Sequence, residues 1–132
     1  MHVLPNLRYT EHHLWLRPVG RNDIYIGITD YAQKELGRID SLDMQREGAQ
    51  KTKGESLGKI FGANKTLELI APFSGRILML NADIGKVPLT LNSDPYLHWI
   101  ALLSIDSKHL QRVKILSAEE YKSRIRQQLI KL

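Results

Sequence analysis

Residues 58–75 read Gly58-Lys59-Ile60-Phe61-Gly62-Ala63-Asn64-Lys65-Thr66-Leu67-Glu68-Leu69-Ile70-Ala71-Pro72-Phe73-Ser74-Gly75, a pattern that predicts a tight β-hairpin. An apolar approach ends near Ile60, and an apolar return strand begins at Leu67. Between them lie Gly62 and Asn64, and both residue types tolerate the backbone dihedrals of turns. Asn64 is therefore expected at the tip, where an asparagine by itself needs no special explanation.

Apolar patterns elsewhere in the chain also indicate strands. Residues 23–29 place an isoleucine at every second position, as a half-buried strand requires. Residues 76–80 and 99–105 are short, apolar and bounded by turn-forming residues, which predicts strands buried on both faces or at a sheet junction. Asn92-Ser93-Asp94-Pro95 is predicted to form a turn. The chain is therefore expected to be mainly β.

Two segments carry the signals of helices. Residues 30–37 begin with a capping aspartate and end at Gly37, which predicts a helix of about two turns. Ser117-Ala118-Glu119-Glu120 is a capping box, in which the serine and Glu120 side chains satisfy free backbone amides. A C-terminal helix over about residues 117–131 follows, with an apolar stripe of Tyr121, Ile125 and Leu129.

Length and composition predict one soluble domain spanning residues 1–132. Hydrophobic residues make up 42% of the chain and charged residues 25%, as in ordinary globular proteins. There is no apolar run of about 18 residues and no signal-peptide pattern at the start, so a cytoplasmic location is expected. The absence of cysteine excludes thiol nucleophiles, disulfides and thiolate metal sites.

The charge balance is basic, with 19 Lys and Arg against 14 Asp and Glu and a formal net charge of +5. This balance favours acidic protein surfaces, nucleic acid or anionic membranes as partners, and of these we expect a protein with an acidic surface. The excess of positive charge is concentrated from Lys108 onward, and its simplest interpretation is the solvent-exposed face of a helix. Only Tyr121 accompanies these cations, so stacking on nucleic acid is not favoured, and nothing indicates membrane binding.

The histidines do not predict a metal or catalytic site. His12 and His13 are adjacent and would point to opposite faces of a strand, so they cannot chelate one ion together. His98 and His109 lack ligand partners at motif spacing, and no nucleophile and base pair is evident. The chain is therefore not expected to be an enzyme.

The ordered set of motifs resembles the H protein family of the glycine cleavage system. The resemblance rests on Tyr9-Thr10-Glu11-His12-His13-Leu14-Trp15-Leu16, Gly27-Ile28-Thr29-Asp30-Tyr31-Ala32-Gln33, Asn92-Ser93-Asp94-Pro95-Tyr96, the hairpin and Ala118-Glu119-Glu120-Tyr121. It implies the lipoyl/biotinyl-domain sandwich of two antiparallel sheets, a barrel-sandwich hybrid with a short internal helix and a C-terminal helix. It also implies a carrier lysine at the hairpin tip.

The residue at the implied carrier position is Asn64. In the family pattern the modified lysine lies six residues after a glycine and eight before a proline, and counts from Gly58 and from Pro72 both reach Asn64. An asparagine amide is not nucleophilic enough to accept lipoate. The resemblance further implies a glutamate three residues earlier that lipoylating enzymes recognise, and this chain has Phe61 there.

Two hypotheses follow from this departure. The first is a non-catalytic H-protein-like domain without lipoate or another cofactor, which acts by protein contact through its hairpin or basic helix. The alternative is a lipoyl carrier modified on Lys65, with glycine cleavage or lipoate-ligase proteins as partners. That alternative needs one insertion before the lysine and one deletion after it, within a tight hairpin.

Overall fold

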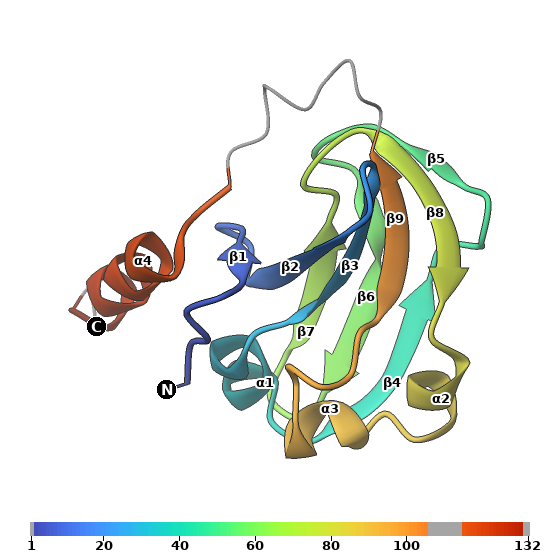
Figure 1. Cartoon of the computed structure of the whole chain (residues 1–132). Helices are drawn as coiled ribbons and strands as arrows, with labels where there is room; N and C mark the ends of the chain where they lie inside the picture. Colours follow the sequence, from blue (N-terminus) through green and yellow to red (C-terminus); the bar gives the residue numbers. More distant parts are fainter. Residues whose placement is uncertain (1, 106–114, 131–132) are drawn as a thin grey trace.

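Two antiparallel sheets face each other in the structure, a computed structural model that describes residues 2–105 and 115–130 (Figure 1). The larger sheet has the strand order β1-β2-β3-β9-β8-β5, and the smaller sheet has the order β4-β6-β7. The predicted fold class, a mainly β sandwich of two antiparallel sheets, is confirmed.

The larger sheet combines strands from both ends of the chain. Its strands are β1 (Arg8–Tyr9), β2 (Leu14–Val19), β3 (Asp23–Ile28), β5 (Gln50–Lys51), β8 (Gly75–Leu80) and β9 (Ala101–Ile105). The smaller sheet is a local meander of β4 (Ile39–Met44), β6 (Ser56–Gly62) and β7 (Thr66–Ile70). The hairpin predicted from residues 58–75 therefore corresponds to β6 and β7, and both strands belong to the smaller sheet.

Four helices are described. They are α1 (Asp30–Leu36), α2 (Ala82–Lys86), α3 (Thr90–Ser93) and α4 (Ala118–Ile130). The sequence predicted α1 and α4, whereas α2 and α3 were missed because each spans hardly more than one turn. Asn92 and Ser93, predicted as part of a turn, are the last two residues of α3. No described helix is long and apolar enough to cross a membrane.

The capping predictions have different outcomes at the two helices. In α4, Ser117 N donates to Glu120 Oε1 at 3.0 Å and Glu120 N donates to Ser117 Oγ at 3.2 Å, so the capping box is confirmed. In α1, the cap is Thr29, whose Oγ1 accepts from Ala32 N, and not Asp30. Asp30 instead lies in the first turn, where it accepts from Gln33 Nε2 at 2.9 Å.

The main core lies between the two sheets. It joins residues such as Ile26 and Leu16 of the larger sheet to Ile60 and Leu69 of the smaller one. A second cluster surrounds Tyr121 and connects α4 to β1 (Figure 1). Tyr121 and Ile125 are buried, as their stripe predicted, while the side chain of Leu129 lies outside the described residues.

Of the two alternatives for residues 76–80 and 99–105, burial on both faces is wrong. In β9, buried residues alternate with partly exposed ones, and Trp99 and Ile100 precede the strand. In β8, Leu78 and Met79 are 39% and 47% exposed. A short apolar run has no periodicity that distinguishes a strand buried on one face from a strand buried on both faces. In this protein the outer face of these strands is partly exposed to solvent.

Candidate functional site

The hairpin tip is a short turn between β6 and β7. Phe61 and Thr66 are the last paired residues of the two strands. Beyond them, Gly62 N donates to Lys65 O at 3.0 Å, which leaves Ala63 and Asn64 as the two residues of the turn itself. The structure therefore places Asn64 at the tip, as predicted.

Backbone hydrogen bonds tie the tip to the end of α1. Asn64 N donates to Leu36 O at 2.9 Å, and Ala63 N donates to Arg38 O at 2.8 Å. Gly62 lies so close to Leu36 O that an added β-carbon could not fit between them. The tip is thus held by main-chain groups on both sides of Gly37, which satisfy the free carbonyls at the end of the helix.

The side chain of Asn64 packs against Gly37, where a β-carbon would lie 2.7 Å from Asn64 Nδ2. Gly37 itself has φ +72°, a conformation that favours glycine. His13 is the only non-glycine residue with positive φ among those described, so Asn64 does not use its tolerance of that region. The turn does not demand an asparagine.

Lys65 is exposed, but its position in the register points toward the larger sheet. Strand residues alternate between faces, and Lys65 continues the set formed by Leu67 and Leu69, which belong to the core side of β7. Its positive charge contributes to the lowered pKa of His13, which agrees with this direction. Lys65 is therefore beside the tip residue and on the side of the turn that faces the sandwich.

Phe61 lies on the outer face of the smaller sheet. Its neighbours across the strands are Ser41 on β4 and Thr66 on β7, which are too small to cover the ring. The side chain is 38% exposed. The position at which the family resemblance implies an acid therefore presents a partly exposed aromatic side chain three residues before the tip.

His13 occupies a strained turn next to this region, with φ +70°. Burial and the charges of Lys65 and His12 lower the pKa of His13 to about 4, whereas Glu35 opposes the shift. Its Nδ1 lies 2.9 Å from the Tyr121 hydroxyl, and its ring lies 4.7 Å from the ring of Tyr31. His13 is therefore neutral at pH 7 and contacts α4.

The expected strand geometry of the histidine pair is wrong, because both residues precede β2 and lie in a turn. His12 is exposed and 3.7 Å from Glu11. Within residues 2–105 and 115–130, no three His, Asp or Glu side chains come together in a way that could hold a metal ion. His109 lies outside the described residues.

Asn92 is a structural residue that sequence reasoning did not identify. Its Nδ2 donates to Gln33 Oε1 and to Gly37 O, both at 2.9 Å, and its Oδ1 accepts from Ile39 N at 2.8 Å. One amide thus joins α3 to the end of α1 and the start of β4. These bonds position Gly37, against which Asn64 packs.

Two surface hollows lie away from the hairpin tip. One, of about 500 Å³, is lined by the N-terminal segment, Asp30 and Tyr96. The other, of about 350 Å³, lies between residues 10–12 and the end of β7 at Ile70. Because β7 runs from Thr66 to Ile70, the second hollow is at the opposite end of that strand, about 13 Å from the tip.

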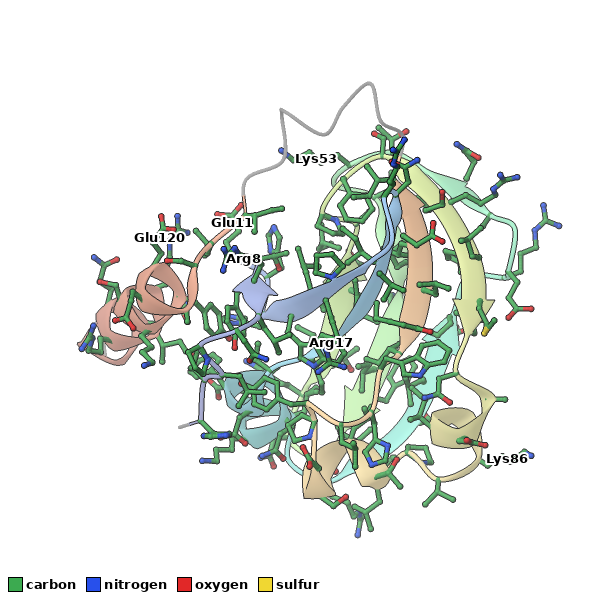
Figure 2. The ribbon with its side chains drawn as sticks, viewed as in Figure 1. Arg8, Glu11, Arg17, Lys53, Lys86 and Glu120 are labelled. Carbon is green, nitrogen blue, oxygen red and sulfur yellow. The ribbon has the colours of Figure 1, made fainter. Side chains whose placement is uncertain are left out.

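The basic C-terminal helix is partly neutralised by carboxylates. Arg124 contacts Glu11 at 3.1 Å, and Lys122 contacts Glu119 at 3.7 Å. Figure 2 shows Glu11, Arg8 and Glu120 gathered where α4 meets the first strands. Lys108, Arg112, Lys114 and Lys131, which contribute to the predicted basic excess, lie outside the described residues.

Comparison with known proteins agrees with the motifs and the fold. The family model described as "Glycine cleavage H-protein" matches residues 7–128. Glycine cleavage system H protein 1 of Caldanaerobacter subterraneus is 36% identical over 122 residues, which are 92% of this chain and 96% of that protein. A probable glycine cleavage system H protein of Pyrococcus abyssi is 34% identical over 119 residues, covering 90% and 89% of the two chains.

A solved structure shows the same architecture. The crystal structure of a glycine cleavage system H protein from Mycobacterium marinum matches with a TM-score of 0.79 and 26% identity. The match covers 92% of this chain and 98% of that one. Proteins of this family are carriers and not catalysts, which confirms the prediction that this chain is not itself an enzyme. The chain belongs to the glycine cleavage H-protein family.

Proposed function

We propose that this chain is a non-catalytic H-protein-like domain that carries no lipoyl group and acts in the cytoplasm through protein contacts. The observation that supports this proposal most directly is the placement of Asn64 at the exposed tip between β6 and β7. Two counts along the sequence assign the carrier position to the same residue. An amide side chain there has no amine on which lipoate could form its amide bond.

The position of Lys65 supports the proposal in a second way. Its carbonyl closes the turn by accepting from Gly62 N, so this residue lies directly before β7. Lys65 directly precedes β7, and the alternation of that strand assigns its exposed side chain to the side of Leu67 and Leu69. A carrier arm needs to extend from the tip, and Lys65 instead lies beside the tip, close enough for its charge to lower the pKa of His13.

Phe61 supports a docking role for the hairpin. An aromatic ring that is 38% exposed between Ser41 and Thr66 can enter an apolar pocket of a partner. Aromatic anchors of this kind often dominate the binding free energy of protein interfaces. The net charge of +5 favours a partner whose surface is acidic around that pocket.

The intact mass of the protein from its native cell tests whether it is modified. We expect the unmodified mass, because the tip offers no lysine amine at the carrier position. A lipoyl-sized increment that maps to Lys65 and disappears in Lys65→Ala would overturn the proposal. It would establish the alternative, a lipoyl carrier with lipoate as its cofactor and glycine cleavage or lipoate-ligase proteins as partners.

A reconstituted lipoylation reaction tests whether the two departures at the hairpin together prevent modification. With lipoate, ATP and a lipoate ligase, the unchanged chain is expected to gain no mass. Asn64→Lys together with Phe61→Glu should gain one lipoyl increment, and Asn64→Arg with Phe61→Glu should gain none. The arginine variant is the matched control, since it adds the same charge without an acylatable amine.

A further inference from the structure

The outer face of the six-stranded sheet carries an apolar strip at its centre. The strip consists of Tyr25 on β3, Leu102 on β9, and Leu78 and Met79 on β8. Tyr25 is the register partner of Leu102, and Leu102 is the register partner of Met79. Residues at the same register on neighbouring strands share one face, so these side chains are contiguous.

A bulge in β8 makes this strip more prominent. The pairing of β8 with β9 shifts between Ile77 and Met79, so Leu78 and Met79 together lie opposite Leu102. Ile77 remains buried in the core, whereas Leu78 and Met79 are 39% and 47% exposed. The bulge therefore adds an apolar side chain to the solvent face instead of to the core.

A row of polar residues runs beside the strip with a specific arrangement of charge. Asp23 on β3 is the register partner of Ser104 on β9, and Ser104 is the register partner of Arg76 on β8. Strands are about 4.8 Å apart, so Asp23 and Arg76 lie about 10 Å from each other on opposite sides of β9. Neither side chain has an ion-pair partner among the described residues.

We propose that two copies of this chain pack face to face through this surface, about a two-fold axis parallel to β9. Such an axis places β3 of one copy over β8 of the other. It does not change the position of a residue along the strand direction, so each row of register partners faces the same row of the second copy. Asp23 then faces Arg76 of the second copy, and Arg76 faces its Asp23. In the next row Tyr25 faces Met79, and Leu102 faces Leu102.

This arrangement is self-complementary in both charge and shape. A two-fold interface forms each contact twice, so it contains two Asp23–Arg76 pairs and two contacts between Tyr25 and Met79. Sulfur and aromatic rings attract each other, and the apolar strip is removed from water. Sheets that pack in this way keep their strands within about 30° of parallel and lie about 10 Å apart.

Neighbouring side chains hold one end of the strip in a fixed conformation. The rings of Tyr25 and Trp99 are 5.0 Å apart, and Arg17 lies 4.8 Å from the ring of Trp15 while donating to Tyr96 O at 3.2 Å. Figure 2 shows Arg17 beside the sheet. A rigid surface loses little side-chain entropy when it associates.

Sedimentation equilibrium over a range of concentrations tests the proposal. The unchanged chain should form dimers, and Arg76→Glu should raise their dissociation constant about tenfold or more, because two pairs of carboxylates then face each other. Lys86→Glu is the matched control, with the same change of charge on α2, where Figure 2 shows Lys86 directed away from the sheets. It should leave the dissociation constant unchanged.

A charge swap provides the decisive comparison. Asp23→Arg should weaken the dimer as Arg76→Glu does, and Asp23→Arg combined with Arg76→Glu should restore it, since each new arginine faces a new glutamate. A chain that stays monomeric at all concentrations, or a double variant as weak as the single ones, would overturn the proposal. Equal weakening by Lys86→Glu would also overturn it, since net charge would then be the cause.

Discussion

The side chain of Asn64 occupies the space that a β-carbon on Gly37 would need, since Asn64 Nδ2 lies 2.7 Å from that position. Gly37→Ala is therefore expected to destabilise the fold by about 1–3 kcal/mol, through backbone strain at φ +72° and displacement of the tip. Urea unfolding measures the loss. Gly20→Ala is the matched control, because Gly20 has φ +70° and nothing within 4 Å of its added β-carbon.

A double variant separates the two contributions at Gly37. If contact with Asn64 matters, Gly37→Ala should cost less free energy of unfolding in an Asn64→Gly background than in the unchanged chain. The same cost in both backgrounds would assign the whole effect to backbone strain and would refute the contact.

Stability should fall as the pH is lowered from 7 to 5, because His13 has a pKa of about 4 in the folded chain and about 6.5 when unfolded. Between these values the unfolded state binds the extra proton, so acid favours unfolding. The expected loss of unfolding free energy is about 1–2 kcal/mol at pH 5. Urea unfolding at both pH values measures it.

The contribution of His13 can be isolated by substitution. His13→Asn tolerates the positive φ and does not titrate, so it should flatten the dependence on pH while lowering stability at pH 7. The exposed His12→Asn should retain the dependence. An unchanged slope in His13→Asn would show that other groups cause the acid sensitivity.

Removal of the Tyr121 hydroxyl should loosen α4. That hydroxyl lies 2.6 Å from Thr29 Oγ1 and 2.9 Å from His13 Nδ1, so Tyr121→Phe leaves one buried and one partly buried polar atom without this partner. The expected cost is about 1–3 kcal/mol, although the ring can still stack on Tyr9. Hydrogen exchange in residues 118–128 should accelerate.

The comparison variant is Tyr25→Phe. Tyr25 is partly buried against the second cluster, and its hydroxyl makes no hydrogen bond to the described residues, so loss of that hydroxyl should change stability little. If the two variants lose the same stability, the buried hydroxyl of Tyr121 does not hold α4 in place.

Asn92→Asp should destabilise the junction between α1 and β4. The substituted oxygen would face the acceptors Gly37 O and Gln33 Oε1, where the amide now donates twice. We expect a loss of about 2–4 kcal/mol, because the new oxygen faces two acceptors in a partly buried position, while the other carboxylate oxygen keeps only the donor Ile39 N. Asn92→Ala should cost less, and chemical denaturation ranks the two variants.

Five of the strands, β3, β6, β7, β8 and β9, and the two longer helices could be predicted because their signals are local. Isoleucine at every second position from 24 to 28 defines one face of β3, and Ser117 with Glu120 defines the start of α4. The open face of β8 could not be predicted. Whether Leu78 meets a second layer depends on the bulge at Ile77 and on the arrangement of the sheets, neither of which has a local signature.

The residues of the candidate site could be predicted, but the hydrogen bonds and backbone conformations that position them could not. Counting along the hairpin placed Asn64, Lys65 and Phe61 near the tip, where the structure has them. The bonds from Asn92 to Gly37 O and Ile39 N join residues more than 50 positions apart, and no sequence pattern reports such distant contacts. The strain at His13 was equally hidden, because histidine has no rule that assigns it a positive φ.

The bonds from Ala63 N and Asn64 N to carbonyls beside α1 use only main-chain atoms. The shape of the tip is therefore indifferent to which side chain it displays, and mutation can exchange that side chain without disturbing the scaffold. In a protein with such a tip, one substitution at the carrier position can remove the site of lipoylation while the domain still folds. The same independence makes position 64 a practical point at which to install new chemistry.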